Sequence, residues 1–150
     1  FIACKVVTLI LAALSSQITP WNDSVRLIFT QDPSTSTVDA VLRRWLSPLA
    51  SWDGAYFLDL AIHGYRWEQQ HAFQPLLPLL IRWTAKAVAL TGISFSTACL
   101  VAGVLWSMLG HALAVQTLHR LSRLILADEQ QAFLAAAFYT HNPASAYLAG

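Results

Sequence analysis

Residues 52–78, WDGAYFLDLAIHGYRWEQQHAFQPLLP, decide how the chain is read. The stretch lies between two long apolar segments and opens with Asp53 among aromatic residues. It ends with Pro75 and Pro78 at the start of an apolar run. A carboxylate framed by aromatic rings beside a bilayer surface suits chemistry on a substrate with one greasy end and one sugar or polar end. This stretch is therefore the main indication of function in the sequence.

The composition predicts an all-α polytopic membrane protein. Hydrophobic residues make up 56% of the 150 residues and charged residues only 11%, whereas soluble domains carry about 25% charged residues. The apolar residues gather in long runs, as in membrane-spanning helices. The net charge of +1 gives no reason to expect a nucleic-acid partner. Cys4 and Cys99 lie in apolar runs and are predicted to be packing residues, not a disulfide or metal pair.

The 150 residues are predicted to form a single partial transmembrane domain. About 20 apolar residues suffice for a helix to cross a bilayer, which gives spans at about residues 1–19, 73–91, 94–118 and 130–150. Pro75 suits the first turn of the second span, whereas Pro78 lies further in and should kink it. Arg82 and Lys86 in the same span are expected to snorkel or to face other helices.

A long extramembrane loop is predicted at about residues 20–72, and it carries short surface helices. Asp39 opens an amphipathic segment with Arg43 and Arg44 on its polar face. The opposite face of that segment is apolar and consists of Val41, Leu42, Trp45 and Leu46. Such a pattern is typical of a helix lying at the membrane surface.

Two further local features follow from turn and cap residues. A short helix is predicted from Asp53 to about Tyr65, with Gly64 as its C-cap. Residues 119–130 are predicted to be a loop, in which Asp128 is the N-cap of the fourth span.

Asp53 admits two interpretations. In the first, its carboxylate satisfies free backbone N–H groups at the start of a helix. In the second, it is a general base at a membrane surface, where the neighbouring rings create apolar surroundings that favour proton abstraction. Spacing alone favours the first interpretation slightly.

Asp59 and His63 are four residues apart on one helix face, and Glu68 and His71 follow shortly. Carboxylate and imidazole groups at such spacing can share a metal ion. No His-Glu-x-x-His pattern is present, however, so an ordinary helix pair with polar loop residues is favoured and no metal site is predicted.

Polar residues also interrupt the later spans. His111 lies in the middle of the third span, where an ionisable residue is either functional or a neutral imidazole bonded to a neighbouring helix. The fourth span contains a polar group whose members either bond between helices around a proline kink or line a cavity: Tyr139, His141, Asn142, Pro143 and Ser145.

These motifs resemble the glycosylphosphatidylinositol mannosyltransferase 2 family of the glycosyltransferase C superfamily. The matching residues are, in order, Trp52-Asp53, Tyr56-Phe57, Gly64-Tyr65, Glu68, Ala72-Phe73, Pro75 and Pro78, with a weaker match at Asn142-Pro143-Ala144-Ser145. The resemblance runs over the whole chain. It implies the N-terminal third of such a protein, so the fragment alone is expected to be inactive.

The resemblance implies a multi-spanning helix bundle in the endoplasmic reticulum membrane, with the main loop luminal. Such enzymes add the second, α-1,6-linked mannose to the glycosylphosphatidylinositol anchor precursor. Their donor is dolichyl-phosphate mannose, and no other cofactor is implied. The partners of the chain are then the lipid bilayer, a lipid-linked donor and a glycolipid acceptor, while a small membrane partner subunit is left open.

Asp53 matches the position of the family's catalytic base. Residue type and proximity then give the candidate substrate-binding residues Trp52, Tyr56, Phe57, Tyr65, Arg66, Glu68 and Asn142. Two other functions stay open at this point, namely a membrane transporter subunit and a non-catalytic membrane partner subunit. Either of these leaves the long aromatic and acidic loop without a chemical role.

Overall fold

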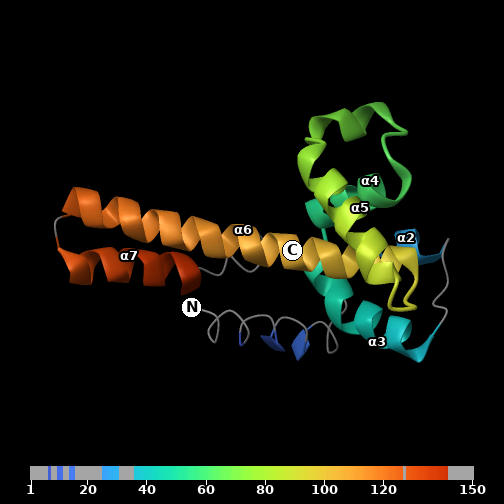
Figure 1. Ribbon diagram of the computed structural model, residues 1–150, viewed down its shortest axis with the longest axis horizontal. Helices are drawn as coiled ribbons and strands as arrows, with labels where there is room; N and C mark the ends of the chain where they lie inside the picture. The colour runs from blue at the N-terminus through green and yellow to red at the C-terminus, as the bar shows by residue number, and fades with distance from the viewer. Residues whose placement is uncertain are drawn as a thin grey trace.

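The computed structural model describes residues 25–30, 36–126 and 128–141, together with the single residues 7, 10, 11, 14 and 15. All of the secondary structure in these residues is helical, which confirms the all-α part of the predicted fold class. The α-helices are α2 (Arg26–Thr30), α3 (Thr37–Leu46), α4 (Asp53–His63), α5 (Leu76–Ala89), α6 (Phe95–Leu126) and α7 (Glu129–His141), and the 3₁₀ helices are η1 (Ser47–Ala50) and η2 (Glu68–Ala72). Helices α3, α4 and α5 gather around one end of α6, and α7 lies along its other end (Figure 1).

Helix α6 is the axis of the structure. Its 32 residues correspond to a length of about 48 Å at 1.5 Å per residue. Among the described residues it is the one helix long and apolar enough to cross a membrane. Leu105, Leu109 and Leu113 point outward along it and are exposed.

The segment 119–130, which the sequence predicts to be a loop, is helical for most of its length. Helix α6 continues through Leu126, so the loop prediction is wrong for residues 119–126. The physical reason is that no glycine or proline follows Gly110 in this helix, and leucine and arginine are good helix formers. Asp128 accepts a hydrogen bond from the backbone N–H of Gln130 at 2.9 Å, which confirms it as a cap for α7.

Helix α5 contains 14 residues and begins directly after Pro75. Pro78 therefore lies in the first turn, where backbone N–H groups have no partner within the helix. Its position costs no hydrogen bond and requires no kink, contrary to the sequence prediction. At about 21 Å, the helix itself is shorter than the roughly 30 Å hydrocarbon core of a bilayer.

The two cations of α5 are accommodated in different ways. A guanidinium N–H of Arg82 donates to the backbone carbonyl of Ala61 in α4 at 3.3 Å. The ammonium group of Lys86 lies over the ring of Trp83, 5.7 Å from its centroid. Arg82 thus faces another helix, as the sequence predicted.

Helix α3 buries its charged face and exposes its apolar face. Asp39 and Arg43 are 0% and 8% exposed, respectively. Val38, Val41 and Trp45 are instead exposed. The sequence placed Arg43 on a solvent-facing surface, and that prediction is wrong. Arg44 is exposed as expected.

The buried charges of α3 are held by the beginning of α6. The guanidinium group of Arg43 donates to three hydroxyl groups at 2.7–2.8 Å, those of Ser94, Ser96 and Thr97. The carboxylate of Asp39 accepts from the backbone N–H of Ser94 at 3.1 Å, and an anion at a helix N-terminus is favourable. The ring of Phe29 in α2 lies against the guanidinium carbon, 4.5 Å from ring centroid to carbon. We call these contacts the Arg43 network.

Helices α5 and α6 approach each other through small residues. Ala85 of α5 and Ala98, Cys99 and Ala102 of α6 are completely buried. Cys99 carries a free thiol and packs in the core, as predicted. Cys4 lies outside the described residues.

The Arg43 network leads to a stability prediction for the full-length protein. Replacing Arg43 with Met should destabilise it, because three hydrogen bonds from a charged group are lost, and such bonds contribute about 1.5–3 kcal/mol each. The thermal unfolding midpoint of the detergent-purified protein measures this change. Arg44→Met, one residue away and exposed, should stay within about 0.5 kcal/mol of the parent. Equal midpoints for the two variants would contradict the structural role of Arg43.

Candidate functional site

The backbone immediately before Asp53 forms a tight turn. The N–H of Gly54 donates to the carbonyl of Ser51 at 3.2 Å. Trp52, between them, has φ 60° and ψ −126°, the values of the second residue in a type II′ turn, a position dominated by small and flexible residues such as glycine. It is the only non-glycine residue with positive φ among those the structure describes. Such strain commonly marks functional positions.

Asp53 is the first residue of α4, and its side chain is exposed. At this position the carboxylate sits at the positive end of the helix dipole. Two aromatic residues close to Asp53 in the sequence are exposed as well: Trp52 is 61% exposed and Tyr56 is 49% exposed. Trp52, not Asp53, is the N-cap residue, and within the described residues no backbone N–H donates to the Asp53 carboxylate, so the capping interpretation is not confirmed. The exposure of the carboxylate is compatible with a solvent-accessible base.

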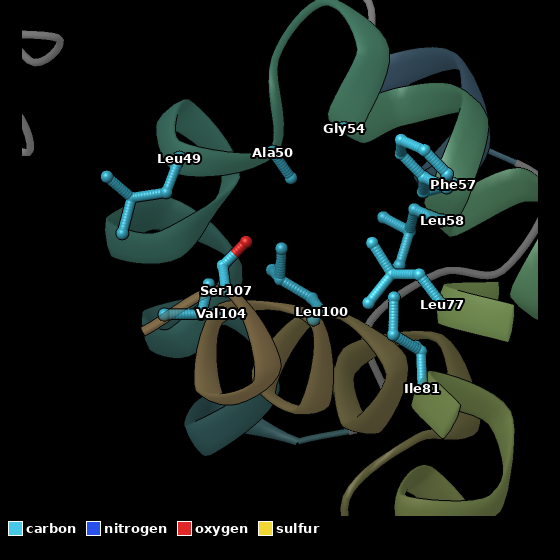
Figure 2. Close-up of a pocket in the computed structure, with 11 residues that line it drawn as sticks. Leu49, Ala50, Gly54, Phe57, Leu58, Leu77, Ile81, Leu100, Val104 and Ser107 are labelled. Atoms are coloured by element: carbon cyan, nitrogen blue, oxygen red, sulfur yellow. The ribbon is translucent and has the colours of Figure 1, made fainter. Parts of the chain in front are cut away.

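An apolar pocket of about 40 Å³ lies behind this turn, between η1, α4, α5 and α6 (Figure 2). Gly54, directly after Asp53, is part of its wall. The other lining residues are Leu49, Ala50, Phe57, Leu58, Leu77, Ile81, Leu100, Gly103, Val104 and Ser107. Ser107 contributes the single polar side chain, and its hydroxyl points from α6 into the pocket (Figure 2).

Aromatic contacts close the segment between α4 and α5. The ring of Tyr56 stacks on that of Phe73 at 4.9 Å between centroids, and Phe57 meets the same ring edge-on at 5.2 Å. Tyr65 stacks on His71 at 4.9 Å, and its hydroxyl donates to the carbonyl of Phe73 at 2.5 Å. The predicted residues Tyr56, Phe57 and Tyr65 are therefore brought together around Phe73.

Asp59 organises the other side of this segment. One of its carboxylate oxygens bonds to Nδ1 of His63 at 2.7 Å, which confirms the predicted helix pair. The same oxygen accepts from the guanidinium group of Arg66 at 2.8 Å, so Arg66 forms an ion pair with Asp59. Glu68 is exposed at the start of η2.

Sequence reasoning missed Gln70. This side chain is 3% exposed and sits at the centre of the segment. Its amide N–H donates to Asp59 at 2.6 Å, and its amide oxygen accepts from the backbone N–H groups of Arg66 and Trp67 at 2.7 and 3.1 Å. A glutamine beside a second glutamine and a histidine reads as an ordinary polar loop residue, so nothing in the local pattern distinguishes it. We refer to residues 56–73, closed by these contacts, as the aromatic loop segment.

The remaining candidates lie elsewhere or outside the described part of the chain. The ring of His111 is buried and stacks on Tyr139 of α7 at 5.2 Å, which favours the structural interpretation of this histidine. Asn142, Pro143 and Ser145 fall outside the described residues. In the parts of the chain that the structure describes, no three His, Cys, Asp or Glu side chains gather as metal ligands would.

Comparison with known proteins matches the chain to the family described as Mannosyltransferase (PIG-V) over residues 1–150. It is similar to GPI alpha-1,6-mannosyltransferase 2 of Cricetulus griseus (35% identity over 150 residues, 99% of this chain and 30% of that protein). The human protein of the same name is 33% identical, with the same coverage of both chains. GPI mannosyltransferase 2 of Drosophila melanogaster is 33% identical over 127 residues, 83% of this chain and 28% of that protein. No solved structure matches the chain. The chain thus spans about 30% of the length of the curated relatives it matches.

The strained turn leads to a prediction about Trp52. Replacement by Gly should give a more stable full-length protein than replacement by Ala, by about 1 kcal/mol. The strain relieved by glycine is about 1–3 kcal/mol, and the greater freedom of glycine in the unfolded chain offsets part of it. Both variants lose the indole, so the difference between their thermal unfolding midpoints isolates the backbone effect. An Ala variant at least as stable as the Gly variant would show that this turn is not strained.

Proposed function

This chain belongs to the mannosyltransferase (PIG-V) family, and from that premise we propose that the full-length protein adds the second, α-1,6-linked mannose to the glycosylphosphatidylinositol anchor precursor. The names of the relatives support this acceptor and linkage. The donor in our proposal is dolichyl-phosphate mannose. The β-linked donor gives an α-linked product, so the reaction inverts the anomeric centre. The proposal concerns the full-length protein, because this chain spans about 30% of such relatives.

The proposed setting is a glycosyltransferase C bundle in the endoplasmic reticulum membrane. In this arrangement α6 crosses the bilayer. The loop at about residues 20–72 faces the lumen, together with the Ser94–Thr97 end of α6 that binds Arg43 of this loop. The long apolar helix α6 supports a membrane location. The outward-facing leucines of α6 support it as well, since a bilayer would cover them.

Asp53 is the proposed general base. Its carboxylate takes the proton from the acceptor 6-hydroxyl while that oxygen attacks the anomeric carbon, and the lipid phosphate departs from the opposite face. A phosphate is a good leaving group, so no strong acid is needed there. The observation that carries the proposal is the exposed carboxylate at the start of α4, directly after a strained turn and in front of an apolar pocket.

The exposed rings of Trp52 and Tyr56 are proposed to pack against the sugars, joined by Phe57 and Tyr65 of the aromatic loop segment. Glu68, exposed in η2, and Asn142 are proposed to bind substrate hydroxyl groups. These assignments extend the proposed site from Asp53 over the whole aromatic loop segment.

Arg66 is proposed to bind the glycolipid acceptor. It pairs with Asp59, which follows Asp53 by about 9 Å along the helix axis at 1.5 Å per residue. This separation favours an arginine from the remainder of the full-length protein as the ligand of the departing phosphate.

The proposal predicts the behaviour of Asp53→Asn in the full-length protein. The variant keeps the size of the side chain and loses the base, so the transfer rate should fall about 10²–10⁴-fold. In cells lacking the second mannosyltransferase, it should fail to restore anchored surface proteins. The one-mannose intermediate should accumulate at a normal level of the variant protein.

Asp128→Asn is the matched control, because it makes the same change at the start of α7, and asparagine caps a helix as well as aspartate does. This control should restore anchored surface proteins fully. Full restoration by Asp53→Asn as well would rule out Asp53 as the base.

A further inference from the structure

We infer that Gln70 is a positioning residue that presents Arg66 and Trp67 as a sugar-binding subsite for the glycolipid acceptor. The inference rests on the proposed function for the identity of the acceptor. It adds Trp67 to the proposed acceptor contacts and gives a reason for a glutamine buried within the aromatic loop segment. Gln70 itself does not touch the acceptor in this arrangement, because only 3% of it is exposed.

Gln70 holds the backbone of both subsite residues. Its amide oxygen accepts from the backbone N–H of Arg66 at 2.7 Å and from that of Trp67 at 3.1 Å. Trp67 is the N-cap of η2, and Gln70 is the third residue of that helix. A glutamine that reaches back from this position to the N-cap N–H is one half of a capping box. One buried side chain therefore sets the path of the chain through residues 66–67.

Gln70 also controls the side chain of Arg66, through Asp59. Its amide N–H donates to one carboxylate oxygen of Asp59 at 2.6 Å, and the other oxygen accepts from the guanidinium group of Arg66 at 2.8 Å. The Arg66 side chain is 40% exposed. A guanidinium group has five N–H donors, and a single terminal nitrogen makes the contact with Asp59. Arg66 thus keeps donors for a ligand while its position is fixed from both ends.

The charge of the subsite suits a sugar better than a phosphate. The negative charge of Asp59 lies next to the positive charge of Arg66, so the pair is neutral as a whole. A phosphate group at Arg66 would also lie near the Asp59 carboxylate and would be repelled by it. Sugar hydroxyl groups carry no charge and accept hydrogen bonds from a guanidinium group. The ion pair therefore favours a neutral, hydroxyl-rich ligand.

Trp67 provides an aromatic surface beside these donors. It is 63% exposed, more than Tyr56 and Tyr65 of the same segment. The face of an aromatic ring is electron-rich and attracts the C–H groups on one side of a pyranose ring. Covering the indole with a sugar would also remove apolar surface from water. Because Gln70 already fixes the backbone of Trp67, binding costs less conformational entropy than it would on a mobile loop.

The distance from Asp53 identifies the acceptor as the ligand. Asp59, the partner of Arg66, follows Asp53 by about 9 Å along the axis of α4, which is longer than one pyranose ring. The donor carries a single mannose, and that sugar must lie at Asp53 when it is transferred. A second sugar-binding position further along the helix therefore belongs to the acceptor, beyond the ring whose hydroxyl attacks.

Equilibrium binding of the acceptor tests the subsite without catalysis. The probe is a radiolabelled one-mannose acceptor with shortened acyl chains, added without donor to the detergent-purified full-length protein. Trp67→Ala should weaken its binding about tenfold, as removal of a well-packed aromatic contact does. Trp67→Phe keeps a ring and should retain most of the affinity. Trp83→Ala removes a 71% exposed indole from α5 and, as the control, should bind like the parent.

Gln70→Glu tests the positioning role through a pH profile. At neutral pH the introduced carboxylate has no hydrogen to donate to Asp59, so acceptor binding should weaken about tenfold. Protonation at acidic pH restores one donor and one acceptor, and the affinity should return to that of the parent at the same pH. His63 and Arg66 also contact Asp59, but they are present in both proteins, so the comparison at each pH removes their effect.

Gln69→Glu is the matched control for this profile, because Gln69 is exposed and directly precedes Gln70. It should follow the parent at every pH. Turnover gives a second measurement: Trp67→Ala and Gln70→Glu should raise the KM of the acceptor and leave kcat and the KM of the donor within about twofold of the parent. A purely structural defect would instead lower the amount of active enzyme and leave both KM values unchanged.

Equal acceptor affinity in the parent and in Trp67→Ala, or a rise in the donor KM alone, would overturn the subsite. Weak binding by Gln70→Glu that does not recover at acidic pH, in a protein with a parental thermal midpoint, would overturn the positioning role. Acceptor binding that depends on Trp67 in a protein without mannosyl transfer would refute the proposed reaction and leave the subsite standing. A parent protein that binds no acceptor would overturn both.

Discussion

The buried guanidinium group of Arg43 is the constraint on which the rest of the structure depends. A charge in such surroundings is tolerable only with its hydrogen bonds satisfied, and the hydroxyl partners of Arg43 all lie at the start of α6. Rotation of α3 about its axis would therefore separate the charge from these hydrogen-bond partners. Because η1 follows α3 directly, the same constraint fixes where the Ser51–Gly54 turn begins. The orientation of Asp53 thus derives from a polar contact about ten residues earlier in the chain.

The sequence predicted helix α3 correctly but not which of its faces is buried. The periodicity of residues 39–46 correctly indicated a helix, because spacing reports which side chains share a face. It could not report which face is buried, since the hydroxyl partners of Arg43 lie 51–54 residues away. Residues 119–126 show the converse error. Their arginines resemble a polar loop, yet arginine and leucine both favour helix, and no residue there ends α6.

In the candidate site, too, features set by local contacts could be predicted from the sequence, and features set by distant contacts could not. The helix start at Asp53, the C-cap Gly64 and the Asp59–His63 pair are all set by residues within a few positions, so their spacing was enough to predict them. The positive φ of Trp52 and the apolar pocket depend on how η1 packs against α6, which no short pattern records. The buried role of Gln70 could not be predicted either, because its hydrogen-bond partners come together only when the loop closes.

The aromatic loop segment has a consequence for the order of assembly. The contacts within it join residues that are at most 17 positions apart in the sequence. The Asp59–His63 pair spans four positions, and the Tyr56–Phe73 stack spans 17. Contacts that close short stretches of chain form early and cheaply. We therefore expect this segment to take shape co-translationally, as soon as Phe73 has emerged from the ribosome. Arg43, in contrast, must wait for Ser94 to be synthesised. The aromatic loop segment, which carries the proposed substrate contacts, would then fold before α6 is complete.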